Sequence, residues 1–349
     1  TSSLQLQVST HFEFTNMKQV SLPKVVVQRS SINGLIIKRN FSAKSTSDGT
    51  KTIGFIGLGN MGFHMASNLV KNGFNLVIHD VNTSSVSKFK ETHKSASVAS
   101  NPKEVASKAD HIITMLPSSP HVTQVFSSET GIFAANPKPN SLFIDASTID
   151  PNVARDIAKK AKESYKSSFL DAPVSGGVVG AEKGTLTFMV GGSQEEFERA
   201  KTILQFMGKN IVHCGGNGNG QVVKLCNNLA LAIEMIGISE AMNLGVTMGM
   251  DAKVLAGIFN TSTSRCWSSD TYNPVPGVME GVPSSRGYTG GFGVDLMAKD
   301  LSLAIAAAHQ SKVPLPLGGQ ALQLYNLISS HGSGGRDFSV VYEFLQKKK

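Results

Sequence analysis

Cysteine is scarce in this sequence, with three residues among 349: Cys214, Cys226 and Cys266. Three widely spaced cysteines form neither an even set of disulfide partners nor a recognisable metal-ligand spacing. A zinc-binding H-E-x-x-H segment is also absent. The sequence therefore predicts no metal site, and its cysteine usage is typical of a protein from a reducing compartment.

Charged residues are few, at 17 % of the chain, and the formal net charge is +8. Half of this excess lies in residues 1–50, which hold six basic and two acidic residues. Basic residues do not cluster with interleaved aromatic residues, so we expect no nucleic-acid partner. The apolar patches Val25–Val27 and Leu35–Ile37 are too short to span a bilayer, and we expect no membrane partner.

Acidic residues are missing from Phe14 to Ser47, where serine and basic residues recur. This composition is typical of an organellar transit peptide. Arg39 lies three positions before Ser42, a spacing that resembles the processing site of plant mitochondrial precursors cut after Phe41. We expect residues 1–50 to be a transit peptide or disordered tail, and the mitochondrial matrix to be the destination. A basic tail on a cytosolic protein is the alternative.

A glycine-rich turn follows directly on the short β-like run Lys51–Ile56 and leads into a helical pattern. This is the dinucleotide fingerprint in its proper context, in which Gly57 permits the tight turn. Gly59 lets the backbone approach a pyrophosphate, and Gly62 lets the helix lie close to the strand. The predicted cofactor contacts in this turn are Gly57, Leu58, Gly59, Asn60, Met61 and Gly62.

A carboxylate stands where the ribose of a bound dinucleotide is recognised. Asp80 ends a second predicted strand, Asn75–His79, eighteen positions after Gly62. At this place a carboxylate accepts hydrogen bonds from ribose hydroxyls. No basic residue stands in 81–84 to bind a 2′-phosphate, so the sequence favours NAD over NADP.

Strand-like runs then alternate with helical runs as far as residue 213, and this alternation predicts a doubly wound, Rossmann-type sheet. The later predicted strands are His111–Met115, Leu142–Asp145, Phe169–Asp171, Thr185–Val190 and Ile211–His213. In the stretch after one of them, Ser175 is followed by Gly176 and Gly177. Consecutive backbone N–H groups there form a concave anion site suited to a carboxylate, with a purely structural turn as the alternative.

The stretch Gly218–Asn228 opens a long helix that runs from Gln221 to about Met248. At ~1.5 Å per residue it spans roughly 40 Å, so we expect it to join two domains. Its apolar residues surround the axis, which predicts that protein covers most of it. Lys224 and Asn228 share one face and are costly to bury unless a site uses them, although a lysine that reaches the surface is the alternative.

Beyond this helix the pattern is helical to the C-terminus, and Ser268–Gly293 is a proline- and glycine-rich candidate lid. The predicted fold is therefore a Rossmann-type α/β domain followed by an all-α domain, joined by the long helix. We place a tail at residues 1–50, the NAD-binding domain at 51–213 and the helical domain at 214–349.

Four motifs, taken together, resemble the β-hydroxyacid dehydrogenase family, and within it the 3-hydroxyisobutyrate dehydrogenases. They are IGFIGLGNMGFHM (53–65), DAPVSGGVVGAEKGTLTFMVGG (171–192), the G-x-G-x-x-x-K-x-x-x-N segment (218–228) and LMAKDLSLA (296–304). The resemblance implies that Lys224 is the catalytic lysine and that Asn228 orients the substrate. It implies the remaining contacts as follows: Ser175, Gly176 and Gly177 for the substrate carboxylate; Leu116, Pro117 and Thr148 for the cofactor; and Lys299 for both, near the nicotinamide end.

Two positions leave questions open. His121 stands where relatives often have asparagine, which puts its cofactor contact in doubt. Asp300 beside Lys299 is equally well explained by a solvated helix face.

The resemblance implies NAD-dependent oxidation of a small 3-hydroxy acid, 3-hydroxyisobutyrate, to methylmalonate semialdehyde in valine degradation. Lys224 would act as the general base once burial lowers its pKa from the ordinary ~10.4. We expect a homo-oligomer, either dimer or tetramer.

Two alternatives remain. A glyoxylate or succinic semialdehyde reductase shares every motif above, and a non-catalytic nucleotide-binding protein shares the fold. A 6-phosphogluconate dehydrogenase is disfavoured, because it would have histidine where Asn227 stands.

Overall fold

The computed structural model describes residues 52–346. The chain divides into two units, Thr1–Ser47 and Asp48–Lys349. The first unit lies outside the described residues, and so do the expected transit peptide and its processing position. All that follows concerns the second unit.

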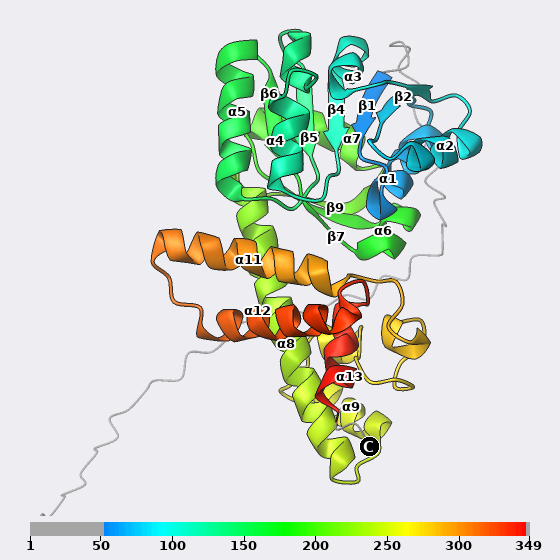
Figure 1. Cartoon of the computed structure of the whole chain (residues 1–349), viewed down its shortest axis with the longest axis vertical. Coiled ribbons are helices and arrows are strands. Elements are labelled where there is room, and N and C mark those ends of the chain that lie inside the picture. The colour runs from blue at the N-terminus through cyan, green and yellow to red at the C-terminus, as the bar shows by residue number, and fades with distance from the viewer. Residues whose placement is uncertain (1–51, 347–349) are drawn as a thin grey trace, which may run out of the picture. The chain divides into compact units, whose positions relative to one another are not determined.

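Six parallel strands form the main sheet in the order β3-β2-β1-β4-β5-β6 (Figure 1). They are β1 (Thr52–Ile56), β2 (Asn75–His79), β3 (Ser97–Val98), β4 (His111–Thr114), β5 (Leu142–Asp145) and β6 (Ser168–Asp171). This is the strand order of a Rossmann fold, in which ligands bind outside the carboxyl ends of the strands. The expected fold class is confirmed.

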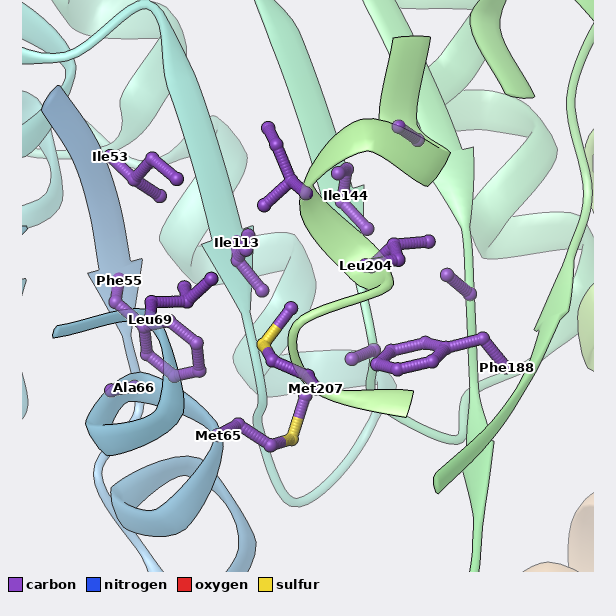
Figure 2. Close-up of a cluster of buried hydrophobic side chains, with 14 of the residues drawn as sticks. Ile53, Phe55, Met65, Ala66, Leu69, Ile113, Ile144, Phe188, Leu204 and Met207 are labelled. Carbon is purple, nitrogen blue, oxygen red and sulfur yellow. The ribbon is translucent and has the colours of Figure 1, made fainter. Parts of the chain in front are cut away.

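Alternate side chains of each strand point to opposite faces of the sheet. Ile53 and Phe55 of β1 and Ile144 of β5 enter one buried cluster, shown in Figure 2, whereas Ile56 and Phe143 enter the other. Both faces are therefore apolar, as a parallel sheet covered on both sides requires.

Helices cover the two faces of the main sheet. Helices α1 (Asn60–Lys71), α2 (Thr83–Thr92), α6 (Gly177–Lys183) and α7 (Gln194–Leu204) contribute to the first cluster. Helices α3 (Pro102–Lys108), α4 (Ser119–Ser127), α5 (Pro151–Tyr165) and the short η1 (Ile132–Ala135) contribute to the second.

The last two predicted strands do not belong to the main sheet. They form a separate three-stranded sheet, made of β7 (Val174–Ser175), β8 (Leu186–Val190) and β9 (Gly208–His213). β7 pairs antiparallel with β8, and β8 pairs parallel with β9.

The long helix α8 (Asn219–Thr247) is present as expected. It contacts α5, β6 and β8 on the sheet side, and α9, α10, α11, α12 and α13 on the helical side. Figure 1 shows it running from the sheet domain through the helical domain. By length and composition it could also cross a membrane, the only such helix among residues 52–346. Its contacts with both domains identify it here as the interdomain helix.

One expectation about α8 is wrong. Val222, Val223 and Leu244 are 40 %, 41 % and 62 % exposed, so one side of the helix is open rather than covered. The buried residues instead include Gln221, Lys224, Asn228 and Ala232. Apolar residues on every side of a helix make each side suitable for burial. They do not ensure that another element of the chain packs against each side.

The helical domain packs around the distal part of α8. Its further elements are α9 (Ala252–Thr261), α10 (Trp267–Asp270), η2 (Pro283–Arg286), α11 (Val294–Ser311), α12 (Pro316–Ile328), η3 (Ser329–Ser333), η4 (Phe338–Val340) and α13 (Val341–Leu345). The stretch Ser268–Gly293 is anchored in this domain: Asn273 and Tyr288 are buried, and the Tyr288 hydroxyl donates to Pro274 O at 2.9 Å. It therefore forms part of the domain core rather than a free lid.

Candidate active site

The glycine turn lies between β1 and α1. Gly57 has φ +98°, and a Cβ there would collide with the carbonyl oxygen of Met115. A Cβ at Gly62 would collide with the carbonyl oxygen of Gly57, so both positions exclude a side chain. Around Gly59 no atom lies within 4 Å of the place where a Cβ would stand. The sequence predicts that this backbone approaches a pyrophosphate, and the structure leaves the space beside Gly59 accessible.

Helix α1 starts at this turn without a side-chain cap on Gly59 and without an acidic residue in its first turn. Gly59 and Asn60 are exposed, and Met61 is partly buried. The first N–H groups of a helix have no partner within the helix, and together with the helix dipole they favour an anion. The turn therefore fits the diphosphate of a dinucleotide.

The carboxylate of Asp80 faces the same turn. Its Oδ2 accepts a hydrogen bond from Leu58 N at 2.6 Å, and its Oδ1 accepts one from Asn82 N at 2.7 Å. Each oxygen keeps further lone-pair capacity for a ribose hydroxyl. Val81, the next residue, is uncharged and 92 % exposed.

Two further loops lie at the carboxyl ends of β4 and β5, and they are tied together through Ser147. The Ser147 hydroxyl accepts a hydrogen bond from Leu116 N at 2.8 Å and donates to Asp145 Oδ1 at 2.6 Å. Thr114 of β4 donates to the same carboxylate oxygen at 2.7 Å. This buried cluster fixes the backbone around Leu116, Pro117 and Thr148, the residues expected to contact the cofactor.

Asp145 itself is fully buried, and its Oδ2 has no hydrogen-bond partner. Burial raises the pKa of Asp145 to about 7, opposed by the Ser147 and Thr114 hydrogen bonds and reinforced by the nearby Asp171. The sequence shows Asp145 at a strand end and the Ser147 hydroxyl just before the next helix. It does not show the contact between these two side chains.

The expected carboxylate cradle follows β7. Gly176 and Gly177 have φ +130° and +61°, conformations that favour glycine, and both are exposed. No atom lies within 4 Å of a Cβ position at Gly177. Among residues 52–346, no hydrogen bond or ion pair links Ser175, Gly176 or Gly177 directly to the polar side chains of α8.

The polar side chains of α8 join those of α11 in a continuous network. Lys224 Nζ donates to Asn228 Oδ1 at 3.1 Å, and Asn228 Nδ2 donates to Asp300 Oδ2 at 2.6 Å. Asp300 Oδ1 lies 3.0 Å from Lys299 Nζ, an ion pair by distance that lacks hydrogen-bond geometry. Lys299 Nζ in turn donates to Thr148 O at 2.7 Å, which brings the network to the loop after β5.

The network is buried, with Lys224, Asn228 and Asp300 only 7 %, 1 % and 2 % exposed. Lys224 is therefore not a surface lysine, and Asp300 is not on a solvated face. Burial lowers the pKa of Lys224; the negative charge of Asp300 opposes this effect, and the positive charge of Lys299 reinforces it. A lysine whose pKa is lowered in this way is closer to the range in which it can act as an acid or a base.

The start of α8 is held by a carboxylate of the main sheet. Asp171 Oδ1 accepts from Gly218 N at 2.6 Å, and Asp171 Oδ2 accepts from Gln221 N at 3.0 Å. Burial raises the pKa of Asp171, an effect that these backbone hydrogen bonds oppose. The carboxylate thus fixes the helix end that carries Lys224, a role that the sequence analysis missed.

The other questioned position, His121, is exposed on α4. Its Nδ1 lies 2.7 Å from the hydroxyl of Ser118, near the loop that contains Pro117. Among residues 52–346, no group of three or more histidine, cysteine, aspartate or glutamate side chains could hold a metal ion.

Family models match nearly all of the described chain. Residues 52–216 match the NAD binding domain of 6-phosphogluconate dehydrogenase, and residues 218–345 match the NAD-binding domain of NADP-dependent 3-hydroxyisobutyrate dehydrogenase.

Similar proteins match most of the chain. A probable mitochondrial 3-hydroxyisobutyrate dehydrogenase of Dictyostelium discoideum is 57 % identical over 318 residues, 91 % of this chain and 98 % of that protein. The mouse mitochondrial 3-hydroxyisobutyrate dehydrogenase is 54 % identical over 87 % of this chain and 90 % of its own length. A probable mitochondrial form from Arabidopsis thaliana is 46 % identical over 90 % and 92 %.

Solved structures agree with this similarity. The 3-hydroxyisobutyrate dehydrogenase of Mycobacterium tuberculosis, determined with L-serine, is 38 % identical with a TM-score of 0.79, covering 85 % of this chain and all of that one. The enzyme of the same name from Salmonella typhimurium is 28 % identical with a TM-score of 0.71, covering 84 % and 100 %.

Proposed function

The chain belongs to the 3-hydroxyisobutyrate dehydrogenase family, and we propose that it oxidises 3-hydroxyisobutyrate to methylmalonate semialdehyde in valine degradation. It is a dehydrogenase that uses a nicotinamide dinucleotide. The observation that carries the proposal is the buried network from Lys224 to Thr148, which joins a lysine whose pKa is lowered by burial to the loop after β5, where we expect the cofactor.

The residues around the crevice fit the cofactor. The open N-terminus of α1 and the turn at Gly59 suit the diphosphate, and Asp80 suits the ribose. Leu116, Pro117 and Thr148 would line the nicotinamide end, where the bound dinucleotide supplies the hydride acceptor.

We favour NAD over NADP, although one matching family model is described as NADP-dependent. Asp80 would repel a 2′-phosphate, and no basic side chain stands in 81–84 to bind one.

Lys224 would supply the acid–base chemistry. In its neutral form Nζ accepts the proton of the substrate hydroxyl while the carbinol carbon loses hydride, and in the reverse direction the ammonium protonates an aldehyde oxygen. Asn228 holds the lysine by its amide oxygen, and Ser175, Gly176 and Gly177 would bind the substrate carboxylate through backbone N–H groups and a hydroxyl. Lys299 would stand beside both substrate and nicotinamide.

The test is a comparison of initial rates for 3-hydroxyisobutyrate, 3-hydroxypropionate, serine and 4-hydroxybutyrate, with NAD and NADP side by side. The proposal predicts the highest kcat/KM for 3-hydroxyisobutyrate with NAD. Assays with glyoxylate and succinic semialdehyde in the reducing direction form the second arm. A higher kcat/KM for either aldehyde would favour the reductase alternative instead.

The location that we propose is the mitochondrial matrix. Supporting observations are the acid-free basic composition of residues 1–50 and the word mitochondrial in the names of the relatives. Mature protein from its tissue should then begin near Ser42. Mass spectrometry of the native protein checks this, and an intact peptide from upstream of Arg29 would contradict it.

We further propose a homo-oligomer, dimer or tetramer. The distal end of α8 and the helix α9 expose a set of large apolar side chains: Leu244, Met248, Val254 and Ile258, each more than half exposed. Exposed large apolar side chains on two neighbouring helices support an interface there. Light scattering should give a mass above that of one chain, and Met248→Lys with Ile258→Lys should lower it.

The division into domains at 51–213 and 214–349 is likewise our proposal. It places the boundary in the short segment between β9 and α8, whose first turn Asp171 holds.

A further inference from the structure

Gln221 is fully buried, and its side chain uses both polar atoms on the loop after β5. Its Oε1 accepts a hydrogen bond from Ile149 N at 3.0 Å, and its Nε2 donates to Ser147 O at 2.8 Å. The orientation of the amide follows from these partners, because Ile149 N can only donate and Ser147 O can only accept. An amide is thus the side chain that satisfies both groups at once.

The same loop is held from a second helix. Lys299 of α11 donates to Thr148 O. This carbonyl lies in the backbone between Ser147 O and Ile149 N, the two groups that Gln221 binds. Ser147 also accepts from Leu116 N, so the constraint extends to the loop after β4. The backbone expected to contact the nicotinamide end is therefore fixed by two side chains from the helical side of the molecule.

Gln221 lies three residues before Lys224 on α8, slightly less than one helical turn. A helix is rigid over one turn, and Asp171 fixes its first turn through Gly218 N and Gln221 N. The side chain of Gln221 therefore connects the loop at Thr148 to the backbone that carries Lys224 by a single short path.

We propose that Gln221 is a positioning residue that sets the placement of the Ser147–Ile149 loop relative to Lys224, and so the alignment of cofactor and general base. This inference rests on the proposed function, since it assumes that Thr148 contacts the cofactor and that Lys224 is the base. Gln221 touches neither reacting group itself. Misplacement of reacting groups by about 1 Å costs up to ~10²-fold in rate, so the contribution is measurable.

Gln221→Glu is the sharpest variant because it exchanges one NH₂ group for an oxygen at nearly the same volume. The ionised carboxylate still accepts from Ile149 N but repels Ser147 O, whereas the protonated carboxyl donates to Ser147 O as the amide did. Burial and the Asp171 carboxylate disfavour ionisation of this group, and Lys224 and Lys299 favour it. The kcat of the variant, divided by the wild-type kcat at the same pH, should rise as the pH falls.

Gln221→Leu removes both hydrogen bonds and should lower kcat by about 10- to 100-fold at every pH. The deuterium isotope effect on kcat, measured with substrate deuterated at the carbinol carbon, should increase, because hydride transfer becomes slower relative to product release. KM for the hydroxy acid should change less than kcat.

The matched control is Gln310→Leu. Gln310 also reaches from the helical domain to the sheet domain, where its Oε1 accepts from Asn152 Nδ2 at 2.9 Å, but it is exposed and its partner lies on α5, outside the Ser147–Ile149 loop. This variant should keep wild-type kcat and isotope effect. Melting temperatures of all variants separate lost folding from lost positioning.

A folded Gln221→Leu with wild-type kcat and isotope effect would overturn the inference. So would a Gln221→Glu variant whose relative kcat does not depend on pH, and this arm remains decisive if the leucine variant fails to fold. The comparison uses whichever hydroxy acid of the panel turns over fastest. A wild-type enzyme with another preferred substrate would thus contradict the proposed function without deciding the role of Gln221.

Discussion

Asp300 on α11 accepts a hydrogen bond of 2.6 Å from Asn228 Nδ2 on α8. Because a carboxylate only accepts, this contact orients the Asn228 amide with its oxygen toward Lys224 Nζ. The aspartate therefore acts on the lysine in two ways: it orients the lysine's hydrogen-bond partner, and its charge favours the protonated ammonium.

The first prediction concerns the acidic limb of the pH–rate profile. In this pH range kcat falls as the pH falls, because Lys224 becomes protonated and cannot accept a proton. Asp300→Asn removes a charge that raises the pKa of Lys224, so the limb in kcat should move to lower pH. Lys299→Met removes a charge that lowers this pKa, so the limb should move to higher pH.

The measurement is kcat against pH for both variants, with Lys299→Arg as the control that keeps the positive charge. Limbs that shift in the same direction, or a limb that does not move in either variant, would contradict the electrostatic account of the network.

The second prediction concerns cofactor choice. Asp80→Ser combined with Val81→Arg removes the carboxylate that repels a 2′-phosphate and adds a guanidinium that can bind it. The ratio of kcat/KM for NAD to that for NADP should fall by at least about tenfold, equivalent to ~1.4 kcal/mol. A wild-type enzyme that already uses NADP better than NAD would show that Asp80 does not set the preference.

Much of the fold was predictable because it depends on local patterns. The glycine turn before α1, the strand end at Asp80 and the length of α8 are all written in consecutive residues. The two-residue strands β3 and β7 were missed since two residues show no periodicity. The separate sheet β7-β8-β9 was missed because a strand-like run does not reveal which strand it pairs with.

The site was predictable in part, for the same reason. Lys224 and Asn228 lie one turn apart, and their shared face follows from helix geometry. The contacts of Asp300 with Asn228 and of Gln221 with Ser147 join residues 72 and 74 positions apart. They depend on how α8 packs against α11 and against the main sheet, which no local pattern specifies. The exposed side of α8 was unpredictable for a related reason. Hydrophobic side chains make a helix face suitable for burial, but they do not show whether another element packs against that face.

The third prediction concerns stability. The ordinary pKa of an aspartate is near 3.8, and that of Asp145 in the folded protein is about 7. Between these values the folded state keeps a proton that the unfolded state has lost, so this carboxyl lowers the stability progressively as the pH rises from about 4 to about 7. A full shift of this size lowers the free energy of unfolding by an amount on the order of 4 kcal/mol.

Asp145→Asn should remove this loss, because the amide oxygen still accepts from Thr114 and Ser147 while the amide carries no charge. The melting temperature of the variant, relative to wild type, should rise between pH 5 and pH 8. Asp156→Asn on the exposed surface of α5 is the control and should follow the wild-type curve. A variant less stable than wild type across this range would show that the ionised form of Asp145 is the favoured one.

The last prediction concerns Lys224, the residue on which the account depends. Loss of a positioned general base costs ~10²- to 10⁴-fold in rate, whereas the expected contacts of the diphosphate and ribose lie at the glycine turn and Asp80. Lys224→Ala should therefore fold and bind NAD like wild type. Lys224→Arg should turn over no faster, because a guanidinium does not deprotonate in this range. Lys253→Ala, on the exposed side of α9, should keep wild-type rates.

The most direct test is the kcat of Lys224→Ala with saturating NAD and 3-hydroxyisobutyrate, measured beside its NAD affinity. A fall in kcat of ~10²-fold or more with unchanged NAD affinity is the predicted result. A variant that binds substrate normally and keeps more than about a tenth of the wild-type kcat would contradict Lys224 as the general base, and Lys299 would be the next residue to test.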